Sequence, residues 1–485
     1  MIPGQLGTGG GEGGRIEEYT WDDTLIWQFT YSTPNYQSHH DIRRLPNGNI
    51  LLLAVEKKNV SQLLAAGFNP AKFQPEITTK GFMLPDYIIE VQPIYPVGGN
   101  ILWQWHVWDH LIQDFDSTKL NYGVVSEHPE RIDADGDGRL LPCFWNHMNS
   151  IAYNAKFDQI ILSVRGNSEV WVIDHSTTTE EAAGHSGGRY GKGGDLLYRW
   201  GNPVCYKMGN VNDQKLFQQH DAEWIDSAYP GGGNILVFNN GLGRNYSTVD
   251  EFTPPVDSFG YYSRLIDSAF GPPNFSWTYT ANPPNSMYSW AISGAQRLPN
   301  GNTLICDGIH GIFLEVTSNG QTVWKYISPV TNQGPLTQGD SIPQDPTHPG
   351  EYMNMVFRVQ RYSPTYEGLN GRDLTPGNYI ELYPTDVDES MNYPTSSFTL
   401  YQNYPNPFNP STMFNFELPI SSVVSLKVFD ILGMEVATLL NNEQLEEGEH
   451  EVQFDANGLT SGVYFYRISV NNGEFTQVKK LMLMK

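Results

Sequence analysis

Short runs in which apolar and polar residues alternate recur along most of the chain, separated by turns rich in glycine and asparagine. Alternation with a period of two is typical of β-strands that bury one face, and Gly-Asn turns are typical of the hairpins between them. Long runs of helix formers are few, and the insertion between Glu56 and Asp86 is expected to be helical in part. The pattern therefore predicts an all-β protein.

A polar phrase that precedes an apolar strand occurs four times. In three copies the phrase carries a histidine, and in the fourth a serine stands in its place; the four residues are His40, His147, His220 and Ser293. A second phrase, apolar-Trp-x-aromatic, ends the same units. It occurs at 25–29, 101–105, 275–279 and 322–326, and at 196–200 with tyrosine in place of the first tryptophan.

A unit that opens with the His or Ser strand and closes with the aromatic strand cannot bury both of its faces alone. Radial stacking of such units as four-stranded sheets would bury them, which predicts a β-propeller with inserted loops over residues 15–385. A large β-sandwich is the alternative, but it would not bring together the recurrent His and Ser residues that open the units (the openers).

The two ends of the chain differ from this repeat. Residues 1–14 are rich in glycine and are expected to be disordered or the remnant of a truncated segment. Residues 386–397 have the composition of a linker. Residues 398–485 show alternating strands with tight turns, which predicts a small, Ig-like β-sandwich as a separate module.

Charge and composition exclude several classes of partner. The chain carries 29 Lys and Arg against 53 Asp and Glu, a net charge of −24, so nucleic acid and anionic membranes are poor partners. No stretch approaches the roughly 18 apolar residues of a membrane span. The three cysteines, Cys143, Cys205 and Cys306, are too few and too scattered for a disulfide framework or a zinc site, and at most one bridge could form.

The recurrent histidines are the candidate chemistry. In a propeller, His40, His147 and His220 would converge near the central channel, and Arg165 follows His147 on the next strand of a hairpin. Neutral imidazoles beside a guanidinium suit transfer of a group that spreads negative charge over three oxygens. Phosphoryl and sulfuryl transfer both fit, and the lack of an evident Mg²⁺ carboxylate pair favours sulfuryl. A three-histidine metal site stays open.

Two further motifs allow two interpretations each. Asp133, Asp135 and Asp137 form the start of a calcium loop, but its twelfth position is Phe144 rather than a bidentate glutamate, so the loop is either a structural calcium site or an exposed acidic turn. The aromatic residues of 103–110 either pack within a blade or line a site for an aryl group.

The phrases HHDIRRLPNGN, HMNSIAYNAKFDQIILSVR, QHDAEWI with GNILVFNNG, and SGAQRLPNGNTLI resemble the bacterial arylsulfate sulfotransferases over most of residues 15–380. The resemblance implies a six-bladed propeller, whose first blade is incomplete if the chain is a fragment. It also implies a ping-pong reaction, without a nucleotide donor or a required cofactor, in which a histidine takes a sulfuryl group from an aryl sulfate and passes it to a phenol.

Carried over by position, the resemblance makes His220 the sulfated nucleophile. It makes His40, His147, Asn149 and Arg165 the residues that bind the sulfuryl oxygens and assist proton transfer. Ser293 comes from the repeat alignment instead, as a hydroxyl donor to the same group. The alternatives are a non-catalytic surface-binding or adhesive propeller that keeps the histidines, and a quinone-dependent dehydrogenase, for which no metal and cofactor constellation is evident.

The C-terminal phrases YPNPFNPST and GLTSGVYFYRI resemble the sorting domain of type IX secretion cargo. The resemblance implies export by the type IX machinery to the surface or surroundings of a Gram-negative cell, with the domain removed or anchored afterwards. Such cargo needs an N-terminal export signal. The first residues lack the charged and apolar regions of a signal peptide, so the chain is expected to be a fragment.

Overall fold

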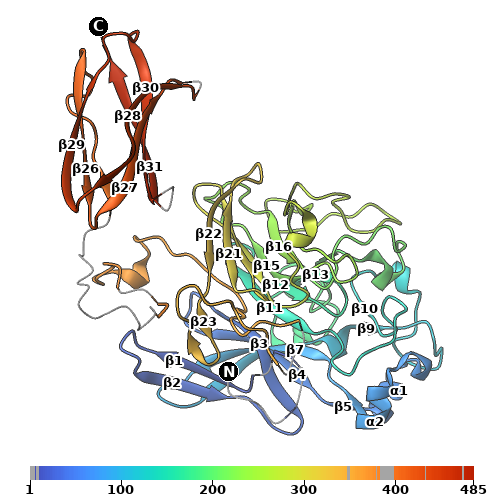
Figure 1. Ribbon diagram of the computed structural model, residues 1–485. Coiled ribbons are helices and arrows are strands. Elements are labelled where there is room, and N and C mark those ends of the chain that lie inside the picture. The colour runs from blue at the N-terminus through green and yellow to red at the C-terminus, as the bar shows by residue number, and fades with distance from the viewer. Residues whose placement is uncertain are drawn as a thin grey trace. The chain divides into compact units, whose positions relative to one another are not determined.

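The computed structural model describes residues 6, 10–11, 13–346, 350–377, 380–382, 398–431, 433–471 and 475–484. Strands dominate both of its compact units, Met1–Tyr383 and Pro384–Lys485, and the helices are few and short (Figure 1). The all-β prediction is confirmed. The predicted linker 386–397 lies outside the described residues. Among those residues, no helix has both the length and the apolar character to span a membrane.

Four antiparallel four-stranded sheets follow one another along the first unit, each in sequence order. Their strands are β3 (Tyr36–Arg44), β4 (Ile50–Glu56), β7 (Asp86–Pro93) and β8 (Gly99–His106); β11 (Met148–Asn154), β12 (Gln159–Val164), β13 (Glu169–Asp174) and β14 (Tyr198–Trp200); β15 (His220–Trp224), β16 (Ile235–Asn239), β17 (Thr248–Phe252) and β18 (Trp277–Thr280); and β19 (Gly294–Arg297), β20 (Thr303–Asp307), β21 (Ile312–Val316) and β22 (Thr322–Ile327).

The sheets reproduce the repeating unit that the sequence predicts. The His or Ser openers lie in or directly before the first strands β3, β11, β15 and β19, and the aromatic phrases fall on the fourth strands β8, β14, β18 and β22. The remaining aromatic phrase lies on β2 (Leu25–Thr30), which pairs with β1 (Arg15–Tyr19) in a two-stranded sheet. The count of six blades stays a prediction.

A recurrent hydrogen bond joins the first strand of each sheet to the first strand of the next. In each case a side-chain oxygen accepts a backbone N–H: Asp41 Oδ2 from Ile151 at 3.1 Å, Ser150 Oγ from Ala222 at 3.0 Å, and Asp221 Oδ2 from Ala295 at 3.1 Å. These residues come one to three positions after the openers. The same bulged turn therefore supplies both the opener and the hydrogen bond between neighbouring sheets.

Arg358 connects the first strands of the first and third sheets. Its guanidinium donates to Asp41 and to Asp221, each at 2.8 Å. Both carboxylates are nearly fully buried, so each requires a cationic partner of this kind. Together with the recurrent hydrogen bonds, Arg358 brings β3, β11, β15 and β19 to a common centre, as the propeller prediction requires.

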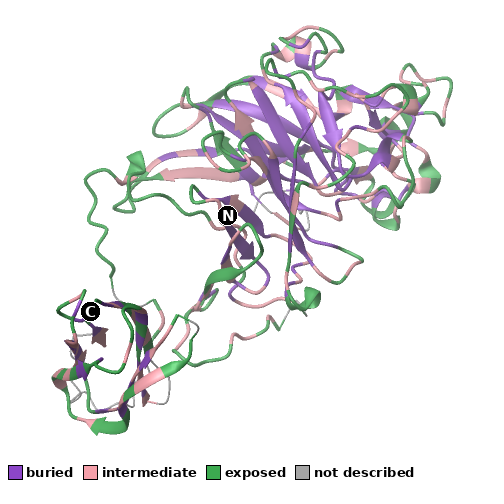
Figure 2. Cartoon of the chain, turned by 90° about the horizontal axis from the view of Figure 1, so that it is seen from above, coloured by how far each residue is buried: buried purple, intermediate pink, exposed green. Residues whose placement is uncertain are grey.

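Hydrophobic cores fill the spaces between neighbouring sheets, and Figure 2 shows the sheet interior as the buried part of this unit. The insertion after β4 forms α1 (Val60–Ala65) and α2 (Pro75–Lys80), as predicted for part of it, and packs Leu63, Phe68 and Ile77 into the first core. The other short elements are β5 (Lys58–Asn59) with β6 (Phe82–Met83), β9 (Leu111–Ile112) with β10 (Ile132–Asp133), β23 (Val330–Thr331) with β24 (Gly334–Pro335), and α3 (Thr179–Ala182). The three cysteines are buried and free.

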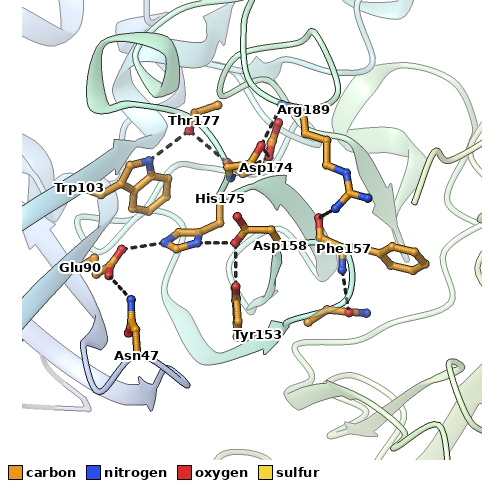
Figure 3. Close-up of polar contacts among 12 residues, drawn as sticks. Asn47, Glu90, Trp103, Tyr153, Phe157, Asp158, Asp174, His175, Thr177 and Arg189 are labelled. Carbon is orange, nitrogen blue, oxygen red and sulfur yellow. Dashed lines mark hydrogen bonds and ion pairs between the residues drawn. The ribbon is translucent and has the colours of Figure 1, made fainter. Parts of the chain in front are cut away.

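His175 joins the first two sheets outside their common centre (Figure 3). Its Nε2 lies 2.9 Å from a carboxylate oxygen of Glu90 on β7, and its Nδ1 lies 2.7 Å from Asp158, which precedes β12. Burial alone lowers the pKa of His175, but the hydrogen bonds and charges of the two carboxylates outweigh burial and raise the pKa to about 9. His175 is therefore a cation at neutral pH.

The second unit contains two antiparallel sheets that share one core. One has the order β25 (Thr399–Leu400), β26 (Ser411–Leu418), β29 (Gly448–Asp455), and the other has the order β28 (Glu435–Leu445), β27 (Ser422–Phe429), β30 (Gly462–Val470), β31 (Phe475–Leu483). Phe414 and Phe416 of the first sheet pack with Leu426 and Tyr466 of the second. The Ig-like topology stays a prediction.

Candidate active site

Backbone bulges position the histidines. The register shifts between Ser38 and Ile42 in β3, between Met148 and Ser150 in β11, and between His220 and Glu223 in β15. His40 and His147 adopt left-handed φ values of 51° and 50°, which few non-glycine residues adopt without a constraint from their surroundings. A bulge re-aims a side chain relative to its strand, so these turns direct the imidazoles out of the regular pleat.

The structure brings His40, His147, His220 and Arg165 together, as the sequence predicts. The rings of His40 and His147 have centroids 4.8 Å apart, and Phe144 stacks on His147 at 4.2 Å. Burial lowers the pKa of all three histidines, that of His220 to about 3. The Arg165 charge lowers each pKa further, and the neighbouring histidines add to the effect at His40 and His147. All three imidazoles are therefore neutral at pH 7.

Asn240 sets the tautomer of His220. The Asn240 Nδ2 group donates to the carbonyls of Ser289 and Ile292, at 2.7 and 2.9 Å, so its Oδ1 is the atom that faces His220. That oxygen lies 2.7 Å from His220 Nδ1 and can only accept, so Nδ1 carries the proton. The lone pair is then on Nε2, where it accepts the Ile292 N–H at 3.2 Å. His220 thus presents a neutral ring with its nucleophilic nitrogen defined.

A second chain of contacts orients His40. His39 Nε2 lies 3.0 Å from the buried carboxylate of Asp86, and His39 Nδ1 lies 2.9 Å from His40 Nδ1. The two facing Nδ1 atoms hold the His40 ring against His39, with one of them as the donor and the other as the acceptor.

The N-terminal glycine segment lies against the same histidine. The Gly11 carbonyl accepts the His40 N–H at 2.9 Å, and a Cβ added at Gly11 would fall 1.9 Å from the His40 ring. Leu6 is buried, and its N–H donates to Gln37 at 2.8 Å. The described residues of segment 1–14 thus contact β3, and only a residue without a side chain fits over His40 at position 11.

Arg165, which directly follows β12, lines a cavity of about 380 Å³ together with Phe144, Trp145, His147 and Gln218. Its guanidinium makes no hydrogen bond or ion pair with the described part of the chain, and its backbone N–H donates to the His147 carbonyl at 3.3 Å. Burial, and after it the charge of Arg139, lowers the pKa of Arg165 to about 10, so the group is still cationic at pH 7. A guanidinium of this kind, beside His147 and aromatic rings, can bind an anion.

The other predicted site residues form contacts within the protein. Asn149 donates through Nδ2 to the Gln219 carbonyl at 2.8 Å, which leaves its buried Oδ1 without a partner. Ser293 donates to Ser289 Oγ at 2.7 Å and accepts the Gly308 N–H at 2.9 Å. These contacts hold the residue before His220 and the loop that contains Ser289, and direct contact of Asn149 or Ser293 with a substrate stays a prediction.

The three aspartates of the predicted calcium loop contact separate partners. Asp133 Oδ2 lies 3.6 Å from Lys207 Nζ, Asp135 accepts the Asn69 N–H at 3.1 Å, and Asp137 pairs with Arg139 at 2.7 Å. Burial raises the pKa of Asp133 to about 6. Two of the three carboxylates thus have a cationic side chain within 4 Å, and calcium binding stays a prediction.

Sequence reasoning missed Asn240, the pair of His39 and Asp86, and Arg358. A signal for Asn240 was present: Arg165 directly follows the second strand of its sheet, and Asn240 directly follows the second strand of the next. Extending the repeat alignment by one strand would have placed both residues at the same site. No local pattern marks Arg358, which lies 317 residues after Asp41.

Known family models match both compact units of the chain. The family model of the arylsulfotransferases matches residues 24–336, and that of the secretion system C-terminal sorting domain matches residues 402–484. The arylsulfate sulfotransferase AssT of Escherichia coli O6:H1 is 26% identical over 287 residues, which are 55% of this chain and 44% of that protein. The chain thus matches less than half the length of this relative.

Similar solved structures include a protein of unknown function from Bacteroides caccae, with 14% identity and a TM-score of 0.32 over 65% of this chain and 75% of the other. A streptogramin B lyase has 9% identity and a TM-score of 0.30, over 67% of this chain and 65% of the other. Structural similarities this low carry no argument about function.

Proposed function

Because the chain belongs to the arylsulfotransferase family, as the match over residues 24–336 shows, we propose that it transfers a sulfuryl group from an aryl sulfate to a phenol through a sulfated His220. The observation that carries the proposal is the state of His220. Its imidazole is neutral, and its Asn240 partner leaves the lone pair on Nε2. The Arg165 cation lies close enough to lower the pKa of His220. We propose a six-bladed propeller as the fold that holds this site.

In the first step the donor sulfate binds beside Arg165, with its aryl group against Phe144 and Trp145. His220 Nε2 attacks sulfur, the bond from sulfur to the aryl oxygen breaks, and a phenolate leaves. The ring gains positive charge as it forms the N–S bond, and the Asn240 Oδ1 that accepts from Nδ1 stabilises that charge. Sulfur displaces the Ile292 N–H from Nε2, and the N–H is then free to donate to a sulfuryl oxygen.

In the second step an acceptor phenol attacks the sulfur of the sulfated histidine. His40 or His147 accepts the phenolic proton, the N–S bond breaks, and His220 returns to its neutral form. The accepted proton then passes to solvent, where it balances the phenolate released in the first step. Arg165 balances the charge on the sulfuryl oxygens in both steps. The steps use only protein groups, and we propose that catalysis requires no cofactor; calcium bound at Asp133, Asp135 and Asp137 would order the loop that precedes His147.

The C-terminal sorting domain points to secretion or the cell surface. We propose that the type IX machinery of a Gram-negative cell exports the chain, so that the aryl sulfate and phenol are extracellular small molecules.

The test is incubation with a chromogenic aryl sulfate in the absence of acceptor, followed by peptide mass analysis under alkaline conditions. We expect one equivalent of released phenol and a sulfated peptide that contains His220, and we expect turnover once a phenol is added. His220→Ala should give neither product, whereas His175→Gln, outside the site, should give both. An unmodified His220 peptide without phenol release would favour the non-catalytic binding propeller.

A further inference from the structure

A second cluster of ligand atoms lies outside the cavity that holds Arg165 and His147. His110, His185 and Asp195 each offer one nitrogen or oxygen atom, and these atoms all lie within 4.8 Å of one another. His110 ends the short helix η2 (Val107–His110) after β8, and the other two lie in the insertion between β13 and β14. Among the described residues, this is the one group of three or more His, Cys, Asp or Glu with such spacing.

Each of the two ring nitrogens of His110 faces an oxygen atom. His110 Nε2 lies 2.9 Å from the Ala182 carbonyl, which only accepts, so Nε2 carries a proton. The other nitrogen, Nδ1, lies 2.9 Å from Asp195 Oδ1, which also only accepts. A neutral His110 would therefore place one lone pair against another in a fully buried position. Either a second proton or a metal ion must lie between these two atoms.

His185 supplies the third ligand. Its Nδ1 lies 2.8 Å from the same Asp195 oxygen, so two imidazole nitrogens and one carboxylate oxygen converge. Imidazole and carboxylate are common ligands of zinc, and a histidine ligand usually donates its other N–H to a carbonyl, as His110 does to Ala182. The second oxygen of Asp195 lies 3.9 Å from Arg131 Nε, which leaves Oδ1 for the cluster.

The surrounding structure holds the His110 ring in place. Trp105 stacks on it with centroids 5.4 Å apart and an interplanar angle of 8°. A Cβ added at Gly194 would fall 2.7 Å from ring atoms of His110 and 2.0 Å from the Ala182 carbonyl, so only glycine at position 194 lets the insertion approach this closely.

We propose that His110 Nδ1, His185 Nδ1 and Asp195 bind a divalent transition-metal ion, with zinc the best match to these ligands. Tetrahedral ligands with bonds of about 2.0–2.1 Å lie about 3.3 Å apart, so the ion moves the Asp195 oxygen about 0.5 Å away from each of the two imidazole nitrogens, which now lie 2.9 and 2.8 Å from it. The His185 side chain is 43% exposed, so solvent completes the coordination on that side. The metal fastens the insertion of residues 176–195 to the edge of the first sheet.

The test is metal binding by the full chain after chelator treatment and dialysis. We expect one equivalent of Zn²⁺ by calorimetric titration and elemental analysis, a visible absorption band on Co²⁺ substitution, and a higher melting temperature with Zn²⁺. His185→Ala removes an exposed ligand, and Asp195→Asn preserves shape; each should weaken Zn²⁺ binding at least about tenfold. Circular dichroism verifies that both variants fold.

Two controls separate this site from other histidines. His128→Ala removes an exposed histidine that pairs with Glu130 outside the cluster, and His220→Ala removes one member of the central group. Both should keep the full equivalent of Zn²⁺ with unchanged affinity. Wild-type protein with no stoichiometric Zn²⁺, or equal affinity in wild type, His185→Ala and Asp195→Asn, would overturn the proposal and leave a protonated His110 in an ion-pair cluster.

Discussion

Two histidines of the first unit show opposite electrostatic environments. His175 lies between the carboxylates of Glu90 and Asp158, which raise its pKa to about 9. His220 lies beside the Arg165 charge and an amide oxygen, and burial together with that charge lowers its pKa to about 3. The difference shows that burial alone does not decide the protonation state. Charged neighbours make His175 a structural cation, and the lack of a carboxylate partner keeps the His220 imidazole neutral.

The largest expected effect comes from removing each imidazole in turn. His220→Ala should lower kcat/KM for aryl sulfate at least about 10³-fold, because no other group replaces the nucleophile. His175→Ala should change kcat/KM by less than about threefold, since its contacts tie two sheets and do not reach the cavity. Initial rates at 25 °C with a chromogenic donor provide the measurement. Equal losses in the two variants would show that the contrast in pKa has no bearing on catalysis.

The next effect concerns the cation beside His220. Arg165 and Arg139 both line the cavity, but Arg139 pairs with Asp137 and donates to the Gly166 carbonyl at 3.0 Å. Arg165→Met should lower kcat/KM about 10²- to 10³-fold, as does loss of a donor to developing charge, whereas Arg139→Met should cost less than about tenfold. Steady-state kinetics of both variants test this. A larger loss in Arg139→Met would show that the anion binds at Arg139 rather than at Arg165.

The sequence predicted what repeats locally. The openers at His40, His147 and His220 and the aromatic fourth strands are short phrases whose period and turns are visible without a structure, and the convergence of the histidines follows from stacking such units. The tautomer of His220 could not be predicted in this way, because it depends on the two carbonyls that orient Asn240. The position of Arg358 depends on a chain segment that returns to the centre after all four sheets.

A smaller effect is expected on the free energy of unfolding, to which the charged His175 contributes. Its folded pKa of about 9 exceeds the ordinary value of 6.5, so its contribution to stability is fully present below pH 6.5 and is lost as the pH rises through 9. At pH 6, His175→Gln should lower the unfolding free energy by about 2 kcal/mol, a value discounted because Asp158 is partly exposed. The deficit should shrink toward pH 10.

Denaturant unfolding at several pH values measures this deficit. His128→Gln is the matched control, because His128 also faces a carboxylate but is 45% exposed. Its effect should stay within about 0.5 kcal/mol at every pH. A pH-independent deficit in His175→Gln would mean that lost packing, rather than lost charge, destabilises the variant.

The smallest effect concerns Glu223, which lies near Asp41, Asp221 and Arg358 at the centre of the ring. Burial, and after it the negative charge of Asp221, raises the pKa of Glu223 to about 8. Because the folded pKa exceeds the ordinary value of 4.5, the contribution of Glu223 to stability is fully present below pH 4.5 and is lost as the pH rises through 8.

Glu223→Gln does not titrate. Between about pH 7 and 9, wild-type protein should therefore lose about 1 kcal/mol more unfolding free energy than the variant does. Parallel pH curves for the two proteins would show that the carboxyl is already ionised at pH 7, and that the centre of the ring holds a net negative charge that Arg358 alone does not balance.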